Sequence, residues 1–169
     1  MNGIAINDAS SPAVLPTMSD RGLRELAGLV RAYSGITVGP DKHQLVANRL
    51  RRRVRELNLD SFERYGEYVR ADGTGAELEV LVDLISTNHT AFFREALHFK
   101  ALASDILPRL RAARGMVRDP LRVWSAACAT GEEAYTLAMV LDEETATDPG
   151  YPIELLASDI SRRALAIAE

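Results

Sequence analysis

The sequence has little cysteine, little histidine and no long apolar run. Its single cysteine, Cys128, excludes an intramolecular disulfide, and one cysteine with three scattered histidines gives no spacing typical of a zinc site. No apolar run approaches the roughly 18 residues that a membrane-spanning helix needs. The N-terminus lacks the charged and apolar regions of a secretory signal. We therefore expect a cytoplasmic protein that has no metal site and does not insert into a membrane.

Positive charge is outnumbered by negative charge overall but locally concentrated. The chain has 20 Lys and Arg against 24 Asp and Glu, a formal net charge of −4, which argues against a general nucleic-acid binder. Its 47% hydrophobic residues suffice for a packed core, and 169 residues allow one domain or two small ones. Against this acidic background, the stretch 41–57 is rich in arginine and lysine.

The basic stretch 41–57 has the periodicity of an amphipathic helix. Its predicted apolar arc is Leu45, Val46, Leu50, Val54 and Leu57. Arg53 falls near this arc, so its side chain should extend to solvent or meet an acidic partner. Arg51, Arg52 and Arg55 fall on the opposite arc, with Asn48. This basic face is either simply solvated or a docking surface for an acidic partner.

Helical patterns fill the rest of the first half after a tail at 1–17, which is rich in Ser, Asn, Ala and Pro. Ser19 and Ser61 stand where helix N-caps are expected, and Gly35 stands where the first helix should end. A fourth helix follows the turn at 72–75. Four short helices joined by turns predict a compact helical domain at 18–86.

The second half, 96–169, predicts a βαβ unit after one long helix. That helix spans about 97–114 and should kink at Pro108. Strands are expected at 121–125 and 153–157, with helices at 132–144 and from Ser161 onward. Between the first strand and its helix, 125–131 contains only small residues. A small-residue turn there lets a ligand approach the backbone and the helix N-terminus, as in nucleotide-type sites.

The acidic residues at the two strand ends limit the ligand. Glu132 and Glu133 stand where a phosphate-binding loop has lysine, so they would repel a triphosphate. Asp159 ends the second strand, where it accepts hydrogen bonds from ribose hydroxyls, or else Asp159 or Ser161 caps the last helix. Glu132 either faces a cationic ligand group or only stabilises the helix dipole. Cys128 is interpreted as a small loop residue, since no neighbouring base is evident.

Three motifs, in this order and spacing, resemble the CheR-type chemotaxis receptor methyltransferases. They are TNHTAFFRE at 87–95, RVWSAACATGEEAY at 122–135 and ASDI at 157–160. The resemblance implies a small helical domain, then a junction motif at 87–95, then a Rossmann-like S-adenosylmethionine-binding domain from 96. The implied activity is transfer of a methyl group from S-adenosylmethionine to protein glutamate side chains, with S-adenosylhomocysteine as product.

The resemblance also implies roles for individual residues. Asn88, Thr90, Arg94, Glu132 and Asp159 would bind the cofactor. Glu132 would face its ammonium group and Asp159 its ribose hydroxyls, while Arg94 would lie beside the reacting centre and the cofactor's carboxylate. The basic helix would meet the Glu-rich cytoplasmic helices of chemotaxis receptors through residues on its arginine-bearing side. These partner-binding residues are Arg49, Arg51, Arg52 and Arg55.

The resemblance covers only the first part of the family's methyltransferase domain. We therefore expect α + α/β architecture with an incomplete Rossmann-like domain, and a truncated piece that binds the cofactor weakly and turns over little. The alternative is a non-catalytic module that keeps the basic helix and binds a receptor or another partner. A methyltransferase acting on a small molecule is disfavoured, because a small substrate needs no basic face.

Overall fold

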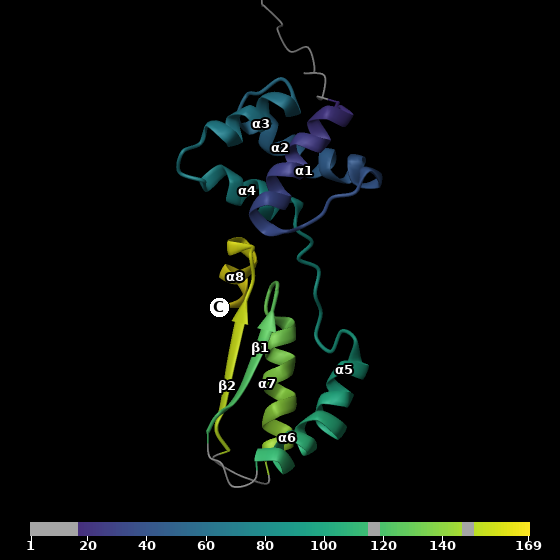
Figure 1. Ribbon diagram of the computed structural model, residues 1–169, viewed down its shortest axis with the longest axis vertical. Coiled ribbons are helices and arrows are strands. Elements are labelled where there is room, and N and C mark those ends of the chain that lie inside the picture. The colour runs from purple at the N-terminus through teal and green to yellow at the C-terminus, as the bar shows by residue number, and fades with distance from the viewer. Residues whose placement is uncertain (1–16, 115–118, 147–150) are drawn as a thin grey trace, which may run out of the picture. The chain divides into compact units, whose positions relative to one another are not determined.

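The computed structural model describes residues 17–114, 119–146 and 151–169. The expected tail therefore lies almost wholly outside the described residues. Two compact units make up the chain, one ending at Ile85 and the other beginning at Ser86. Figure 1 shows helices in the first unit, and a small sheet with helices in the second. No helix among the described residues is long and apolar enough to cross a membrane.

The first unit is helical throughout, and its helix ends follow the sequence signals. Ser19 caps the first helix by accepting a hydrogen bond from Gly22 N at 3.0 Å, and Gly35 ends that helix at φ 76°. Ser61 caps the third by accepting from Arg64 N at 3.3 Å. The elements are α1 (Asp20–Ser34), the 3-10 turn η1 (Pro40–Lys42), α2 (His43–Glu56), α3 (Phe62–Ala71) and α4 (Ala76–Ile85).

One core unites these helices. It is built from Leu26 and Val30 of α1, Leu50 and Val54 of α2, and their neighbours in α3 and α4. The expected inward position of Leu45 is wrong, because this side chain is 44% exposed. At about 100° per residue, Leu45 lies far from the arc centred on Val46, Leu50 and Val54.

Of the two outcomes expected for Arg53, extension to solvent or an acidic partner, the structure shows the acidic partner. Its guanidinium donates to both carboxylate oxygens of Glu77 on α4, at 2.9 and 2.5 Å, and Tyr65 OH donates to the same carboxylate at 2.9 Å. Glu77 is buried, so the pair joins α2 and α4 inside the unit. The hydrogen-bonded carboxylate raises the pKa of Arg53, and burial raises the pKa of Tyr65.

The second unit begins with a helix interrupted ahead of Pro108. The helix α5 (Ala96–Ala101) widens into the π-helical segment η2 (Leu102–Ile106) and continues as α6 (Leu107–Arg114). Pro108 has no N–H to donate, and its ring crowds the preceding turn. The predicted disruption is thus present, but as a π segment before the proline.

A two-stranded parallel sheet with its helices completes this unit. The elements are β1 (Leu121–Ala126), α7 (Glu132–Thr145), β2 (Ile153–Ser158) and α8 (Arg162–Ala168). The register runs from Leu121 opposite Ile153 to Ala126 opposite Ser158. Leu121 packs in a core with Leu107 and Leu141. The chain is thus a helical unit followed by a parallel βαβ unit, as expected.

The other sheet face is open among the described residues. Trp124 and Leu156 are register partners and are 65% and 61% exposed. Trp124 Nε1 donates to Ser158 Oγ at 2.9 Å along this face.

Candidate functional site

The loop after β1 is tightly folded at the carboxyl end of the strand. Ala127, Ala129 and Gly131 have φ of 68°, 49° and 98°, so three residues of this loop adopt left-handed conformations. Such a conformation costs about 1 kcal/mol or more for a non-glycine residue, so the surroundings must hold it. Cys128 N donates to Ser158 O at 2.9 Å, which ties the loop to the end of β2.

The Asp159 carboxylate connects this loop to the start of the last helix. Its Oδ2 accepts from Ala129 N and its Oδ1 from Ser161 N, both at 2.8 Å. Ser161, not Asp159, caps α8, accepting from Ala164 N at 3.0 Å. An ionised carboxylate offers about four acceptor positions, so these two bonds leave capacity for hydroxyl donors.

Glu132 is the first residue of α7 and is half-buried. Thr130 Oγ1 donates to its Oε2 at 2.6 Å, which orients the carboxylate beside the loop. The next residue, Glu133, accepts a hydrogen bond of 2.7 Å from the buried hydroxyl of Ser125 at the end of β1. Two acidic side chains in the first turn suit the positive end of the helix dipole.

The segment 87–95 is tied to the starts of both α7 and α8. Asn88 Nδ2 donates to Ser161 Oγ at 2.9 Å. Phe93 N donates to Thr136 Oγ1 at 3.2 Å, and this hydroxyl in turn donates to Glu132 O at 2.6 Å. Asn88 is therefore connected to Asp159 through Ser161, and the following turn is connected to Glu132 through Thr136.

Arg94 lies in the turn that precedes α5 and is exposed. Its Nη1 donates to His89 O at 2.7 Å, which fixes the direction of the guanidinium while other N–H donors remain. Phe93 and Glu95 on either side have φ of 54° and 58°. Thr90 is half-buried in the same segment.

The sequence did not indicate the connecting roles of three residues: Ser125, Thr136 and Ser161. Ser161 was recognisable as a helix cap, but its contact with Asn88 joins residues 73 positions apart. Thr136 lies one turn after Glu132, and nothing in its immediate sequence marks it. Cys128 is 1% exposed, and burial, with the nearby charge of Asp159, raises the pKa of its thiol. A protonated buried thiol is a packing residue.

The basic side of α2 is built differently for each arginine. Arg49 donates to the carbonyl of Ile85, so it joins α2 to the end of α4. Arg51 Nη1 donates to Asn48 at 2.9 Å, and Arg52 pairs with Glu56 at 2.7 Å. Arg55 Nε donates to Arg51 O at 3.3 Å. Arg52 and Arg55 are exposed, whereas Arg49 and Arg51 are half-buried.

Two family descriptions match this chain in adjoining ranges. "CheR methyltransferase, all-alpha domain" matches residues 21–86, and "CheR methyltransferase, SAM binding domain" matches residues 88–169. The chain belongs to the CheR methyltransferase family. The range matched by the all-alpha domain lies in the helical unit, apart from Ser86, and the range matched by the SAM binding domain lies in the second unit.

Relatives with the name "Chemotaxis protein methyltransferase" agree with this membership. The relatives from Salmonella typhimurium (strain LT2) and Escherichia coli (strain K12) are each 38% identical to this chain over 148 residues. The aligned part is 88% of this chain in both cases, 48% of the Salmonella protein and 49% of the Escherichia coli protein. "Chemotaxis protein methyltransferase 2" of Pseudomonas aeruginosa is 42% identical over 133 residues, 78% of this chain and 44% of its own. This chain of the CheR family spans about half the length of the relatives that it matches.

Proposed function

We propose that the protein transfers a methyl group from S-adenosylmethionine to glutamate side chains of chemotaxis receptors. The observation that carries the proposal is the convergence of Glu132, Asp159 and the segment 87–95 at the carboxyl edge of the β1–β2 sheet. Membership of the CheR family and the relatives' name support the same reaction. In this proposal, the chain supplies the first part of the cofactor site and a receptor-docking helix.

The residues at the sheet edge suit the chemical groups of S-adenosylmethionine. Glu132, oriented by Thr130, is a carboxylate for the ammonium group. Asp159 has acceptor capacity left for the ribose hydroxyls after binding two backbone N–H groups. The loop 125–131 contains only small residues, so its backbone is open to close approach by the ligand.

The segment 87–95 provides the remaining groups. Arg94, directed by its bond to His89 O, would bind the cofactor's carboxylate and lie beside the reacting centre. Asn88 and Thr90 would act as polar anchors, with Asn88 held by Ser161. The contacts of Asn88 and Phe93 with α8 and α7 position this segment before any ligand binds.

The reaction asks the protein for positioning rather than proton transfer. The bound S-adenosylmethionine supplies an electrophilic methyl group on a sulfonium. A substrate glutamate, with an unperturbed pKa near 4.3, is already a carboxylate at neutral pH. Its oxygen would take the methyl group in an in-line displacement, with the electron pair of the broken carbon–sulfur bond leaving on sulfur, so the residues at the sheet edge would only need to hold the two reactants in line. No base is needed, so the buried, protonated Cys128 has no chemical task.

The basic side of α2 is proposed to bind the acidic receptor helices. Arg52 and Arg55 are exposed and Arg51 adjoins them, so these three offer a positive face. Arg49 contributes less directly, because its guanidinium binds the carbonyl of Ile85. If the protein is instead a non-catalytic binding module, this positive face alone would carry its function.

Transfer of a radiolabelled methyl group tests the proposal. The substrate is a cytoplasmic receptor fragment, and base-labile label on its glutamates is measured with this chain and with any longer form of the protein. Arg94→Ala and Glu132→Gln should each lower transfer at least tenfold, while Glu143→Gln, at the far end of α7, should not. Receptor binding without transfer in every form would favour the non-catalytic module.

A further inference from the structure

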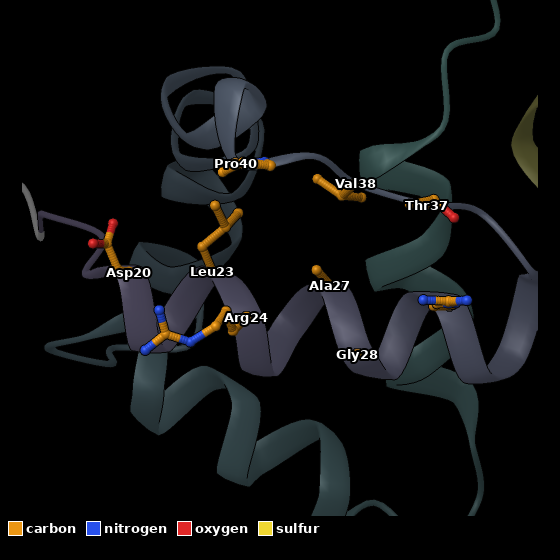
Figure 2. Close-up of a pocket in the computed structure, with 9 residues that line it drawn as sticks. Asp20, Leu23, Arg24, Ala27, Gly28, Thr37, Val38 and Pro40 are labelled. Carbon is orange, nitrogen blue, oxygen red and sulfur yellow. The ribbon is translucent and has the colours of Figure 1, made fainter.

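A half-open groove runs along one side of α1 in the helical unit. It has a volume of about 610 Å³, and the segment 37–40 forms its opposite wall. Figure 2 shows Leu23 and Ala27 projecting from α1 toward Val38 and Pro40. The lining residues are Asp20, Leu23, Arg24, Ala27, Gly28, Arg31, Thr37, Val38 and Pro40.

Gly28 lies near the middle of α1, where the fold does not require a glycine. Its φ is not in the left-handed region, and a Cβ added there would meet nothing within 4 Å. Glycine inside a helix costs about 0.5–1 kcal/mol relative to alanine. Together with Ala27, the glycine leaves a shallow stretch of groove in which another backbone can approach closely.

Two arginines border this shallow stretch. Arg24 and Arg31 are both exposed, and neither guanidinium forms an ion pair with a residue that the structure describes. They are seven positions apart, so a rise of 1.5 Å per residue places them roughly 10 Å apart along the axis. Asp20, the groove's only acidic lining residue, lies 3.9 Å from His43 Nε2.

We propose that this groove binds an acidic helix of a partner protein. A helix carrying two carboxylates seven residues apart would match Arg24 and Arg31, with small or aliphatic side chains between them against Gly28, Ala27 and Val38. Helix-in-groove recognition uses apolar anchors at such spacings, and the flanking charges set orientation and partner choice. The surface is separate from methyl transfer, since it uses neither the sheet-edge residues nor the basic side of α2.

The probe is a blocked, alanine-based helical peptide of about 18 residues. It carries two glutamates seven residues apart, with leucines midway, and the control peptide has lysines in place of both glutamates. Amide spectra of the isotopically labelled 169-residue chain should shift at Leu23, Gly28 and Val38 with the glutamate peptide. The lysine peptide should bind at least tenfold more weakly. Equal binding of both peptides, or shifts confined to α2, would overturn the proposal.

Matched variants separate groove binding from loss of folding. Gly28→Leu should fill the groove and weaken peptide binding about tenfold without lowering the unfolding temperature of the chain. Gly73→Leu is the control, because its Cβ position also meets nothing within 4 Å but lies in a turn outside the groove. Charge reversal of Arg24 and Arg31 to glutamate should transfer preference to the lysine peptide. Unchanged preference, or groove shifts that depend on protein concentration without peptide, would contradict a partner helix.

Discussion

Asp159 accepts a hydrogen bond of 2.8 Å from the backbone N–H of Ala129, thirty positions earlier in the chain. The carboxylate that is proposed to bind ribose hydroxyls therefore also shapes the loop that lies beside the cofactor. The two roles are compatible, because each oxygen accepts only one backbone hydrogen bond. Cofactor affinity and loop order should consequently be coupled through this one side chain.

Replacing Asp159 by alanine should loosen the loop as well as the cofactor site. Two backbone N–H groups lose a charged acceptor, and hydrogen bonds to charged groups contribute about 1.5–3 kcal/mol each at most. We expect faster amide hydrogen exchange at Ala129 and Ser161 and a lower free energy of unfolding of the second unit. Unchanged exchange at Ala129 would show that the left-handed loop is held by other contacts.

Replacing Glu77 by glutamine should weaken the helical unit. Glu77 is buried and receives hydrogen bonds from Arg53 and Tyr65, so an amide there leaves a charged donor poorly matched. We expect a loss of about 2 kcal/mol in the free energy of unfolding, measured by urea titration. A double-mutant cycle with Arg53→Met should show that most of this loss requires Arg53. Additive effects would mean that the pair is not coupled.

Much of the helical unit could be predicted because its signals are local. Ser19, Gly35 and Ser61 mark helix ends by the conformations and hydrogen bonds of their own neighbourhood. An acidic partner was one of two outcomes expected for Arg53, but the identity of that partner, Glu77, was not predicted. That identity depends on how α2 and α4 pack, which the spacing within either helix does not contain.

In the second unit, too, the local elements could be predicted but the contacts between them could not. Both strands and their acidic ends were predicted, and so was a disruption near Pro108. The contacts Asp159–Ala129 and Asn88–Ser161 were not, because they exist only once β1 and β2 pair in register. The assignment of cofactor groups to Arg94, Glu132 and Asp159 came from family resemblance and stays a prediction.

The turn that begins α4 should make the helical unit sensitive to acid. Hydrogen bonds from the Thr74 hydroxyl, and then from the Glu77 N–H, hold the pKa of Asp72 below its usual value. Because the pKa of Asp72 is lower in the folded chain than in the unfolded chain, where it is about 3.9, its ionised carboxylate stabilises the fold above that pH. This stabilisation is lost as the pH falls through the folded pKa. Unfolding curves below about pH 4 should therefore show Asp72→Asn losing less stability with acid than the parent chain. Parallel curves would contradict this.

Charge reversal on α2 should separate docking from cofactor binding. Arg51, Arg52 and Arg55 changed together to glutamate should weaken binding of the receptor fragment at least tenfold and leave cofactor affinity unchanged. Arg64→Glu on α3 is the control for a change of charge on the same unit. Arg49→Glu should additionally destabilise the unit, because its guanidinium binds the carbonyl of Ile85. Receptor binding that survives the triple reversal would remove α2 from the docking surface.

Binding of S-adenosylmethionine at the carboxyl edge of the β1–β2 sheet is the step on which the proposed function depends. Its most direct test is a titration of the isotopically labelled 169-residue chain with S-adenosylhomocysteine, followed by amide spectra up to millimolar ligand. Shifts are expected at Asn88, Arg94, Ala129, Glu132 and Asp159. Glu132→Gln should weaken the binding at least tenfold, and Glu143→Gln should not. Shifts elsewhere, or shifts that Glu132→Gln leaves unchanged, would contradict it.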